Sequence, residues 1–135
     1  VMAFRILDKL GMPADEIATV CSAIGNHDES TAFPVNAVAA ALILADKTDV
    51  RRTRVRNRDK ATFDIHDRVN YAVEKASTTL DAAGKAVVLD LQLDTGMSPV
   101  IDYFEIFLER MLLCRKAAEK LGLSFRLVVN GQTVL

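Results

Sequence analysis

The sequence is short of the residues and segments that build disulfide-stabilised or membrane-spanning proteins. Its 135 residues include two cysteines, three prolines and no tryptophan. Cys21 and Cys114 are too few for a disulfide framework and lack the paired spacing of a zinc site, so we expect thiols in a reducing cytoplasm. No apolar run approaches the roughly 20 residues of a membrane span, and no signal peptide precedes the first expected helix. These absences predict a cytoplasmic protein that does not enter a membrane.

The chain also lacks a charge excess of either sign. Its 17 basic and 18 acidic residues give a net charge of −1 with both histidines neutral. This balance provides no overall attraction to nucleic acid or to an acidic membrane, so nucleic acid is not the expected partner. The exception is a local run of cations at residues 51–60. Half of the residues are hydrophobic, and a chain of this length buries roughly two thirds of its unfolded surface, which is enough for a core.

Hydrophobic spacing predicts helices in the first 75 residues, where apolar side chains recur at intervals of three and four. The four helical segments are 2–10, 13–24, 35–48 and 65–76. Gly11 is suited to end the first helix, and Pro13 is suited to begin the second. Asp64 fits an N-cap of the fourth helix. Alternation over residues 69–73 also fits a strand, which is the competing interpretation of the fourth segment.

After residue 75 the pattern changes to the alternation that is typical of β-strands. Residues 76–93 alternate around a turn at 81–84, which predicts a β-hairpin with one buried face. Residues 125–135 alternate around Asn130-Gly131, which is a type I′ hairpin signal. The C-terminal part is therefore expected to contain two hairpins.

A long helix separates these hairpins. Ser98 fits its capping position, Pro99 fits its first position, and the apolar spacing continues to Leu121. The order ββαββ predicts a small module in which one long helix covers an antiparallel sheet. We therefore expect an α+β chain with two domains, a helical domain at 1–75 and the α+β module at 76–135.

Asp46 is the residue that most needs an explanation. It follows an apolar run at residues 35–45 that fits a largely buried helix. An ionised carboxylate there costs several kcal/mol unless a cation, a metal ion or hydrogen-bond donors compensate it. One interpretation is an ion pair with Arg51 or Arg52. The other is metal ligation, with His27 of the preceding loop as a companion donor.

Two short motifs resemble the C-terminal half of the HD-domain metal-dependent phosphohydrolases. They are Ile24-x-x-His27-Asp28-Glu29 and Leu44-Ala45-Asp46-Lys47-x-Asp49. The resemblance covers about residues 1–75 and implies a helical domain that holds one or two divalent metal ions, either Mn, Fe, Ni, Mg or Zn. By the resemblance, Asp46 is the last metal-ligating aspartate and His27 is a ligand of a second metal. Lys47 and Asp49 match positions that contact the substrate.

Other parts of the family pattern are not found in this sequence. The family's first histidine has no counterpart, and neither His-Asp dipeptide, at His27 and at His66, is followed by the sequence of the family's central motif. His66-Asp67 fits a capping pair at a helix start. The chain also begins at Val1 rather than at a methionine. We therefore expect a fragment whose missing N-terminal part carries the other ligands, and which has little activity by itself.

Six basic side chains lie close together after Asp46. They are Arg51, Arg52, Arg54, Arg56, Arg58 and Lys60. They fit either a solvated basic loop or a phosphate clamp, because planar guanidinium groups bind phosphate oxygens through two hydrogen bonds. A clamp beside a metal ion fits phosphoester hydrolysis, in which the metal activates water and the cations stabilise the phosphoryl oxygens. Arg51, Arg52 and Lys47 are therefore the expected substrate-binding residues.

The sequence thus predicts part of a metal-dependent phosphohydrolase for a phosphorylated or nucleotide substrate, with Asp46, Lys47 and Asp49 as catalytic residues. The alternative is a noncatalytic module that binds a nucleotide or nucleic acid, or that dimerises. The apolar side chains from Tyr103 to Met111 fit an ordinary core, and a homodimer interface is their second interpretation.

Overall fold

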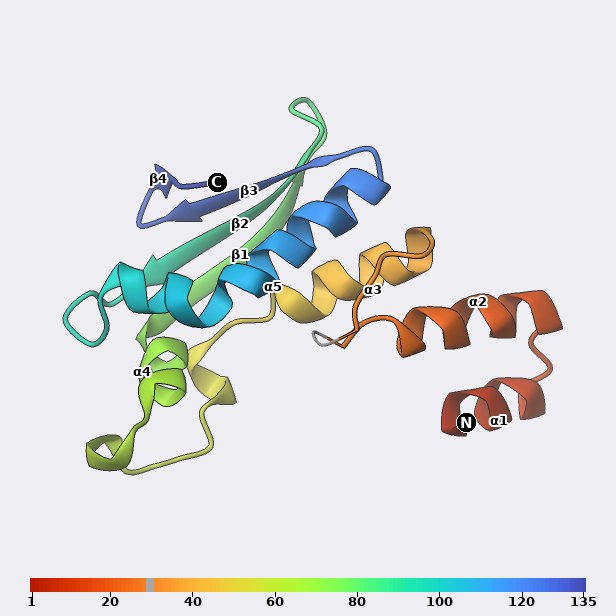
Figure 1. Ribbon diagram of the computed structural model, residues 1–135, viewed down its shortest axis with the longest axis horizontal. Helices are drawn as coiled ribbons and strands as arrows, with labels where there is room; N and C mark the ends of the chain where they lie inside the picture. Colours follow the sequence, from red (N-terminus) through yellow and green to blue (C-terminus); the bar gives the residue numbers. More distant parts are fainter. Residues whose placement is uncertain (29–30) are drawn as a thin grey trace.

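The computed structural model describes residues 1–28 and 31–135, where one long helix covers a face of a four-stranded sheet and the first two helices lie away from the sheet (Figure 1). The elements in chain order are α1 (Met2–Lys9), α2 (Ala14–Gly25), α3 (Ala37–Lys47), the short 3₁₀ turns η1 (Arg52–Arg54) and η2 (Lys60–Thr62), α4 (Ile65–Ala72), β1 (Val73–Asp81), β2 (Ala86–Leu93), α5 (Val100–Lys120), β3 (Ser124–Val129) and β4 (Gln132–Thr133). The predicted α+β class is confirmed.

The three N-terminal helices form where the sequence predicts them. Gly11, just beyond α1, has a φ of +74°, a left-handed conformation that glycine adopts without strain. Pro13 occupies the N-cap position of α2. Asn36 caps α3, and its side-chain oxygen accepts a hydrogen bond from the N–H of Ala39 at 2.8 Å. Local chemistry therefore sets these helix boundaries.

The sheet is mixed, so the predicted antiparallel sheet is wrong. Its strand order is β1-β2-β3-β4, in which β2 and β3 are parallel and the two outer pairs are antiparallel. The cause is α5, whose 21 residues extend about 31 Å and return the chain along the length of β2 before β3 begins. A crossover helix of this kind joins parallel strands.

The fourth helix is shorter than predicted. α4 ends at Ala72, and residues 73–76, which were expected to be helical, begin β1. The N–H of Asp94 donates to the carbonyl oxygen of Ala72 at 2.8 Å, so pairing with the sheet begins where the helix stops. The predicted N-cap is confirmed, because Asp64 Oδ1 accepts a hydrogen bond from the N–H of Asp67 at 2.8 Å.

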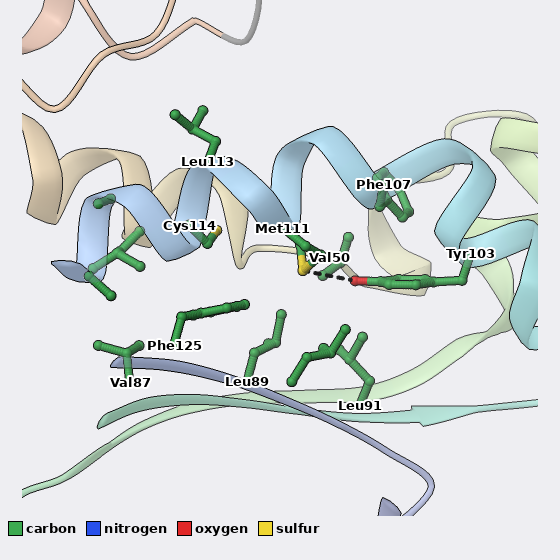
Figure 2. Packing of buried hydrophobic residues seen from close by; sticks show 14 of the residues in the cluster. Val50, Val87, Leu89, Leu91, Tyr103, Phe107, Met111, Leu113, Cys114 and Phe125 are labelled. Atoms are coloured by element: carbon green, nitrogen blue, oxygen red, sulfur yellow. Dashed lines mark hydrogen bonds between the residues drawn. The ribbon is translucent and has the colours of Figure 1, made fainter. Parts of the chain in front are cut away.

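The main core lies between α5 and the sheet (Figure 2). Tyr103, Phe107 and Met111 of α5 are buried on the side that faces Leu89 and Leu91 of β2. The O–H of Tyr103 points to Met111 Sδ at 3.7 Å. These three side chains are therefore core residues, and they are not available as a homodimer interface.

Residues on both sides of position 75 contribute to this core. Ile43 and Leu44 of α3 belong to the same buried cluster as Leu89 of β2 and Ala117 of α5. α3 reaches this cluster because it packs against α5. The division into two domains, at 1–75 and 76–135, stays a prediction.

Candidate functional site

Asp46 lies in the last turn of α3, next to a buried lysine. Lys47 Nζ donates to Asp46 Oδ2 at 2.6 Å. The side chain of Lys47 is 7% exposed, whereas that of Asp46 is 37% exposed. The more deeply buried charge is therefore the cation of Lys47, which the sequence motif predicted to contact the substrate. No sequence signal marks this burial, because lysine is rarely fully buried.

The surroundings of Asp46 keep its carboxylate ionised at neutral pH. Burial raises the pKa of Asp46, but the hydrogen bond from Lys47 and the charges of Lys47, His27 and Arg110 outweigh this effect. The pKa therefore lies below its ordinary value of 3.8. The expected compensation of the Asp46 charge is present, and its main source is Lys47.

His27 lies just beyond the end of α2. Its Nδ1 is 2.6 Å from the carbonyl oxygen of Ile24. Because a carbonyl oxygen only accepts hydrogen bonds, Nδ1 carries the hydrogen. In the neutral ring, Nε2 is then the nitrogen with a free lone pair, which is the form that ligates metals. His27 also lies close enough to Asp46 for its charge to lower the pKa of that carboxyl.

Two donors alone do not complete a metal centre. Within residues 1–28 and 31–135, no group of three or more His, Cys, Asp or Glu side chains is arranged to hold a metal ion. Catalytic zinc sites usually take three protein ligands, so Asp46 and His27 fit only part of a ligand set. Glu29, which follows in the first motif, lies outside the described residues. Metal ligation by Asp46 and His27 stays a prediction.

The first arginines of the basic segment pair with Asp49 rather than with Asp46. Arg51 Nε donates to Asp49 Oδ1, and Arg54 Nη1 lies 3.3 Å from Asp49 Oδ2. The hydrogen bond to Asp49 raises the pKa of Arg51. Arg54 also donates to the Asp49 carbonyl oxygen at 3.0 Å. Two guanidinium groups thus share one carboxylate, and the ion pair between Asp46 and Arg51, which was one of the two interpretations of Asp46, does not form.

Arg52 fastens the basic segment to α4 and β1. Its Nε donates to the Tyr71 carbonyl oxygen at 2.8 Å, and its Nη2 lies 3.6 Å from Glu74 Oε1. Its guanidinium carbon is 4.5 Å from the centre of the Tyr71 ring, and Lys60 Nζ is 4.6 Å from the same centre. Cations are attracted to the faces of aromatic rings, so Tyr71 helps to hold this segment. Tyr71 belongs to no sequence motif, so this role could not be predicted from the sequence.

An open pocket of about 520 Å³ lies between the end of α3 and β1. Its lining consists of Leu44, Ala45, Thr48, Asp49, Arg51, Ala76 and Thr78. Because successive helix residues are about 100° apart, Asp46 lies on the opposite side of α3 from Leu44 and Thr48. The structure therefore brings Asp49 and Arg51 together at this pocket, and it places Asp46 on another side of the helix.

His66 and Asp67 belong to the first turn of α4. The N–H of Asp67 donates to the N-cap residue Asp64, and Asn57 Nδ2 donates to Asp67 Oδ2 at 3.3 Å. His66 is exposed. This dipeptide is therefore a feature of a helix start, as the sequence indicated.

Comparisons with known proteins do not place the chain in a family. No family model, curated protein or solved structure matches it. The likeness to HD-domain phosphohydrolases therefore depends on the two sequence motifs.

Cys21 and Cys114 do not form a disulfide. In the part of the chain that the structure describes, none of the helices has both the length and the apolar content needed to cross a bilayer.

Proposed function

We propose that the chain is part of an HD-type metal-dependent phosphohydrolase that acts in the cytoplasm on a phosphorylated or nucleotide substrate. The observation that best supports this function is the Asp46 carboxylate, which is ionised at the end of an apolar helix and lies within electrostatic reach of His27. A carboxylate and a neutral imidazole are donors that borderline divalent metals accept.

In this proposal Asp46 ligates a divalent metal ion, and His27 offers Nε2 to a second one. When bound, the metal (Mn, Fe, Ni, Mg or Zn) would lower the pKa of a coordinated water and so provide the nucleophile. Lys47 donates to Oδ2 of Asp46 and so restricts the orientation of that carboxylate. Asp46 and His27 would be only part of the ligand set of such a centre.

Asp49, Arg51 and Arg52 are the proposed substrate contacts. Asp49 and Arg51 line the open pocket, and the Arg51 side chain is 61% exposed. Because this pocket lies on another side of α3 from Asp46, a substrate phosphate held there would be one that does not react. It would replace Asp49 as the acceptor for Arg51, which exchanges one charge-assisted hydrogen bond for another. The buried Lys47 acts on Asp46, and its effect on the substrate is therefore indirect.

Metal binding tests this proposal. We expect Mn²⁺, titrated into the protein and followed by the EPR signal of the free ion, to bind weakly because the ligand set is incomplete. Asp46→Asn should abolish this binding. Asp8→Asn, which changes an exposed acid on α1, is the matched control and should bind as the wild type does. Equal Mn²⁺ binding by the wild type and the Asp46→Asn variant would refute the assignment.

Activity provides the second test. A protein that combines this chain with the remaining metal ligands should show Mn- or Ni-dependent phosphatase or phosphodiesterase activity. We expect Asp46→Asn to remove it, because the substituted amide is a much weaker metal ligand than a carboxylate. Full activity of this variant would exclude Asp46 as a ligand.

The alternative function is a noncatalytic module that binds a nucleotide or nucleic acid through the basic segment. Arg56 and Arg58 are exposed there and lie between two further cations, Arg54 and Lys60. Binding to a phosphate backbone weakens steeply with salt. Oligonucleotide affinity that falls with salt, and that Arg56→Ala with Arg58→Ala removes, would support this alternative. No binding at low salt would eliminate it.

A further inference from the structure

β1 forms one edge of the sheet, and among the described residues no strand pairs with its outer side (Figure 1). It is nine residues long, whereas β4 at the opposite edge has two residues. A long uncovered edge strand is a template for pairing with another strand. β1 is therefore the edge at which this sheet is able to extend.

The hydrogen bonds of β2 show which backbone groups of β1 point outward. The N–H of Asn130 donates to the Leu91 carbonyl oxygen at 2.9 Å, so Leu91 directs its backbone groups toward β3. Backbone direction alternates along a strand, so the neighbouring Asp90 directs its groups toward its β1 partner Ser77. The β1 residues on either side of Ser77 therefore direct their backbone N–H and C=O groups away from β2, as does every second residue after them. These residues are Ala76, Thr78 and Leu80.

We propose that two copies of this chain pair through β1, antiparallel and centred on Thr78. In this register the two Thr78 residues face each other, and Lys75 of each copy lies opposite Asp81 of the other. Opposite charges directly across an antiparallel pair are stabilising. Asp81 is already held in place, because Arg126 Nη2 lies 3.1 Å from its Oδ2. The strand is thus complementary in charge to a second copy of itself.

The neighbouring registers lose this complementarity. Centring the pair on Ser77 places Lys75 opposite Thr79, and centring it on Thr79 places Lys75 opposite Ala83. Neither shift gives the lysine a charged partner. The charge pattern of β1 therefore selects the register centred on Thr78.

The same register covers an exposed apolar side chain. Leu80 is 66% exposed and lies opposite Val87 of β2 on the face of the sheet that carries the core. In the proposed pair it packs against Ala76 of the second copy. Ala76 and Thr78 also line the open pocket beside α3, together with Asp49 and Arg51. A second copy paired along β1 would therefore enter this pocket and compete there with the proposed substrate.

The resulting interface is symmetric about a two-fold axis through the Thr78 pair. Three outward-pointing pairs form, one between the two Thr78 residues and two between Ala76 and Leu80. Each exchanges two backbone hydrogen bonds, which gives about six between the copies. The two four-stranded sheets then become one continuous sheet, with both α5 helices on the same face.

The oligomeric state of the whole chain tests this inference. We expect light scattering after gel filtration to show a concentration-dependent dimer. Thr78→Pro removes the central outward N–H without breaking a bond to β2, and should weaken the dimer by about tenfold or more. Thr78→Val keeps that N–H and should dimerise as the wild type does. A wild type that stays monomeric to millimolar concentration, or a Thr78→Pro variant that dimerises fully, would overturn the proposal.

A charge variant gives an independent result if the proline variant fails to fold. Lys75→Glu places a glutamate opposite Asp81 of the second copy and should weaken the dimer at low salt. Because salt screens exposed charges, raising the salt concentration should reduce this difference. Dimerisation of Lys75→Glu that equals the wild type at all salt concentrations would contradict the register.

Oxidative cross-linking tests the register directly, in a Cys21→Ser background that leaves Cys114 buried. Two cysteines introduced by Thr78→Cys face each other across the axis and should form an intermolecular disulfide. Ala76→Cys is the matched control, because its two copies lie about four residues apart along the strand, beyond the reach of a disulfide. Equal cross-linking by both variants would exclude the proposed alignment.

Discussion

α1 and α5 are both amphipathic in sequence, but only α5 buries its apolar side. α5 contains seven buried residues and α1 contains none. Three apolar side chains of α1 are more than half exposed, namely Met2, Phe4 and Ile6. Leu10, which directly follows the helix, is also more than half exposed. α5 lies across the sheet, whereas α1 lies at the far end of the molecule and contacts α2 (Figure 1). Hydrophobic spacing therefore identifies a helix, but the neighbouring elements decide what covers it.

The largest expected effect is in the layer between α5 and the sheet. Leu89→Ala removes a fully buried side chain and should lower the free energy of unfolding by about 2–5 kcal/mol, because a cavity replaces it. Ile6→Ala, on α1, is the control and should change it by less than about 0.5 kcal/mol. Urea denaturation measures both. Equal losses for the two variants would remove the contrast between the helices.

The second effect concerns the ion pairs at the end of α3. Lys47→Met keeps the apolar stem but removes the cation that is hydrogen-bonded to Asp46, and should cost about 1–2 kcal/mol because Asp46 is only partly exposed to water. Arg51→Ala removes an exposed partner of Asp49 and should cost much less, because water screens this pair. Denaturation at neutral pH compares them. A larger loss for Arg51→Ala would show that burial does not determine the strength of these pairs.

The smallest effect is a pH dependence at Asp46. Its pKa is lower in the folded chain than in the unfolded chain, so its ionisation stabilises the fold above the unfolded value and this contribution is lost as the pH falls through the folded value. The stability difference between the wild type and Asp46→Asn should therefore be constant near neutral pH and shrink below about pH 4. Denaturation curves across this range measure it, and a difference that grows on acidification would reverse the sign.

Much of the fold follows from local sequence signals. Asn130 and Gly131 have φ values of +49° and +80°, as the predicted type I′ turn requires. The mixed sheet did not follow, because alternating apolar residues such as Leu89 and Leu127 look the same in parallel and antiparallel strands. The long helix between β2 and β3 held the missing information, since a crossover of that length fits parallel strands.

The candidate site was predictable only in part. The need to compensate Asp46 follows from its apolar surroundings, and the structure supplies that compensation. The part of Lys47 in it was not predicted, because Lys47 extends into the interior while Arg51 and Arg54 bind Asp49. Such pairings depend on how an irregular segment folds back on itself, which periodicity does not encode. The sequence also could not predict that Asp46 lies away from the pocket, because the pocket depends on where β1 lies relative to α3.

The most direct test of the proposed metal site is the paramagnetic broadening of amide resonances on titration with Mn²⁺. Ligation by Asp46 and His27 predicts that the amides around these two residues broaden first, and that Asp46→Asn abolishes the selective effect. Signals of Ile6 on α1 should stay sharp and serve as the internal control. Uniform broadening of the spectrum, or broadening centred on Asp49 at the open pocket, would contradict the account.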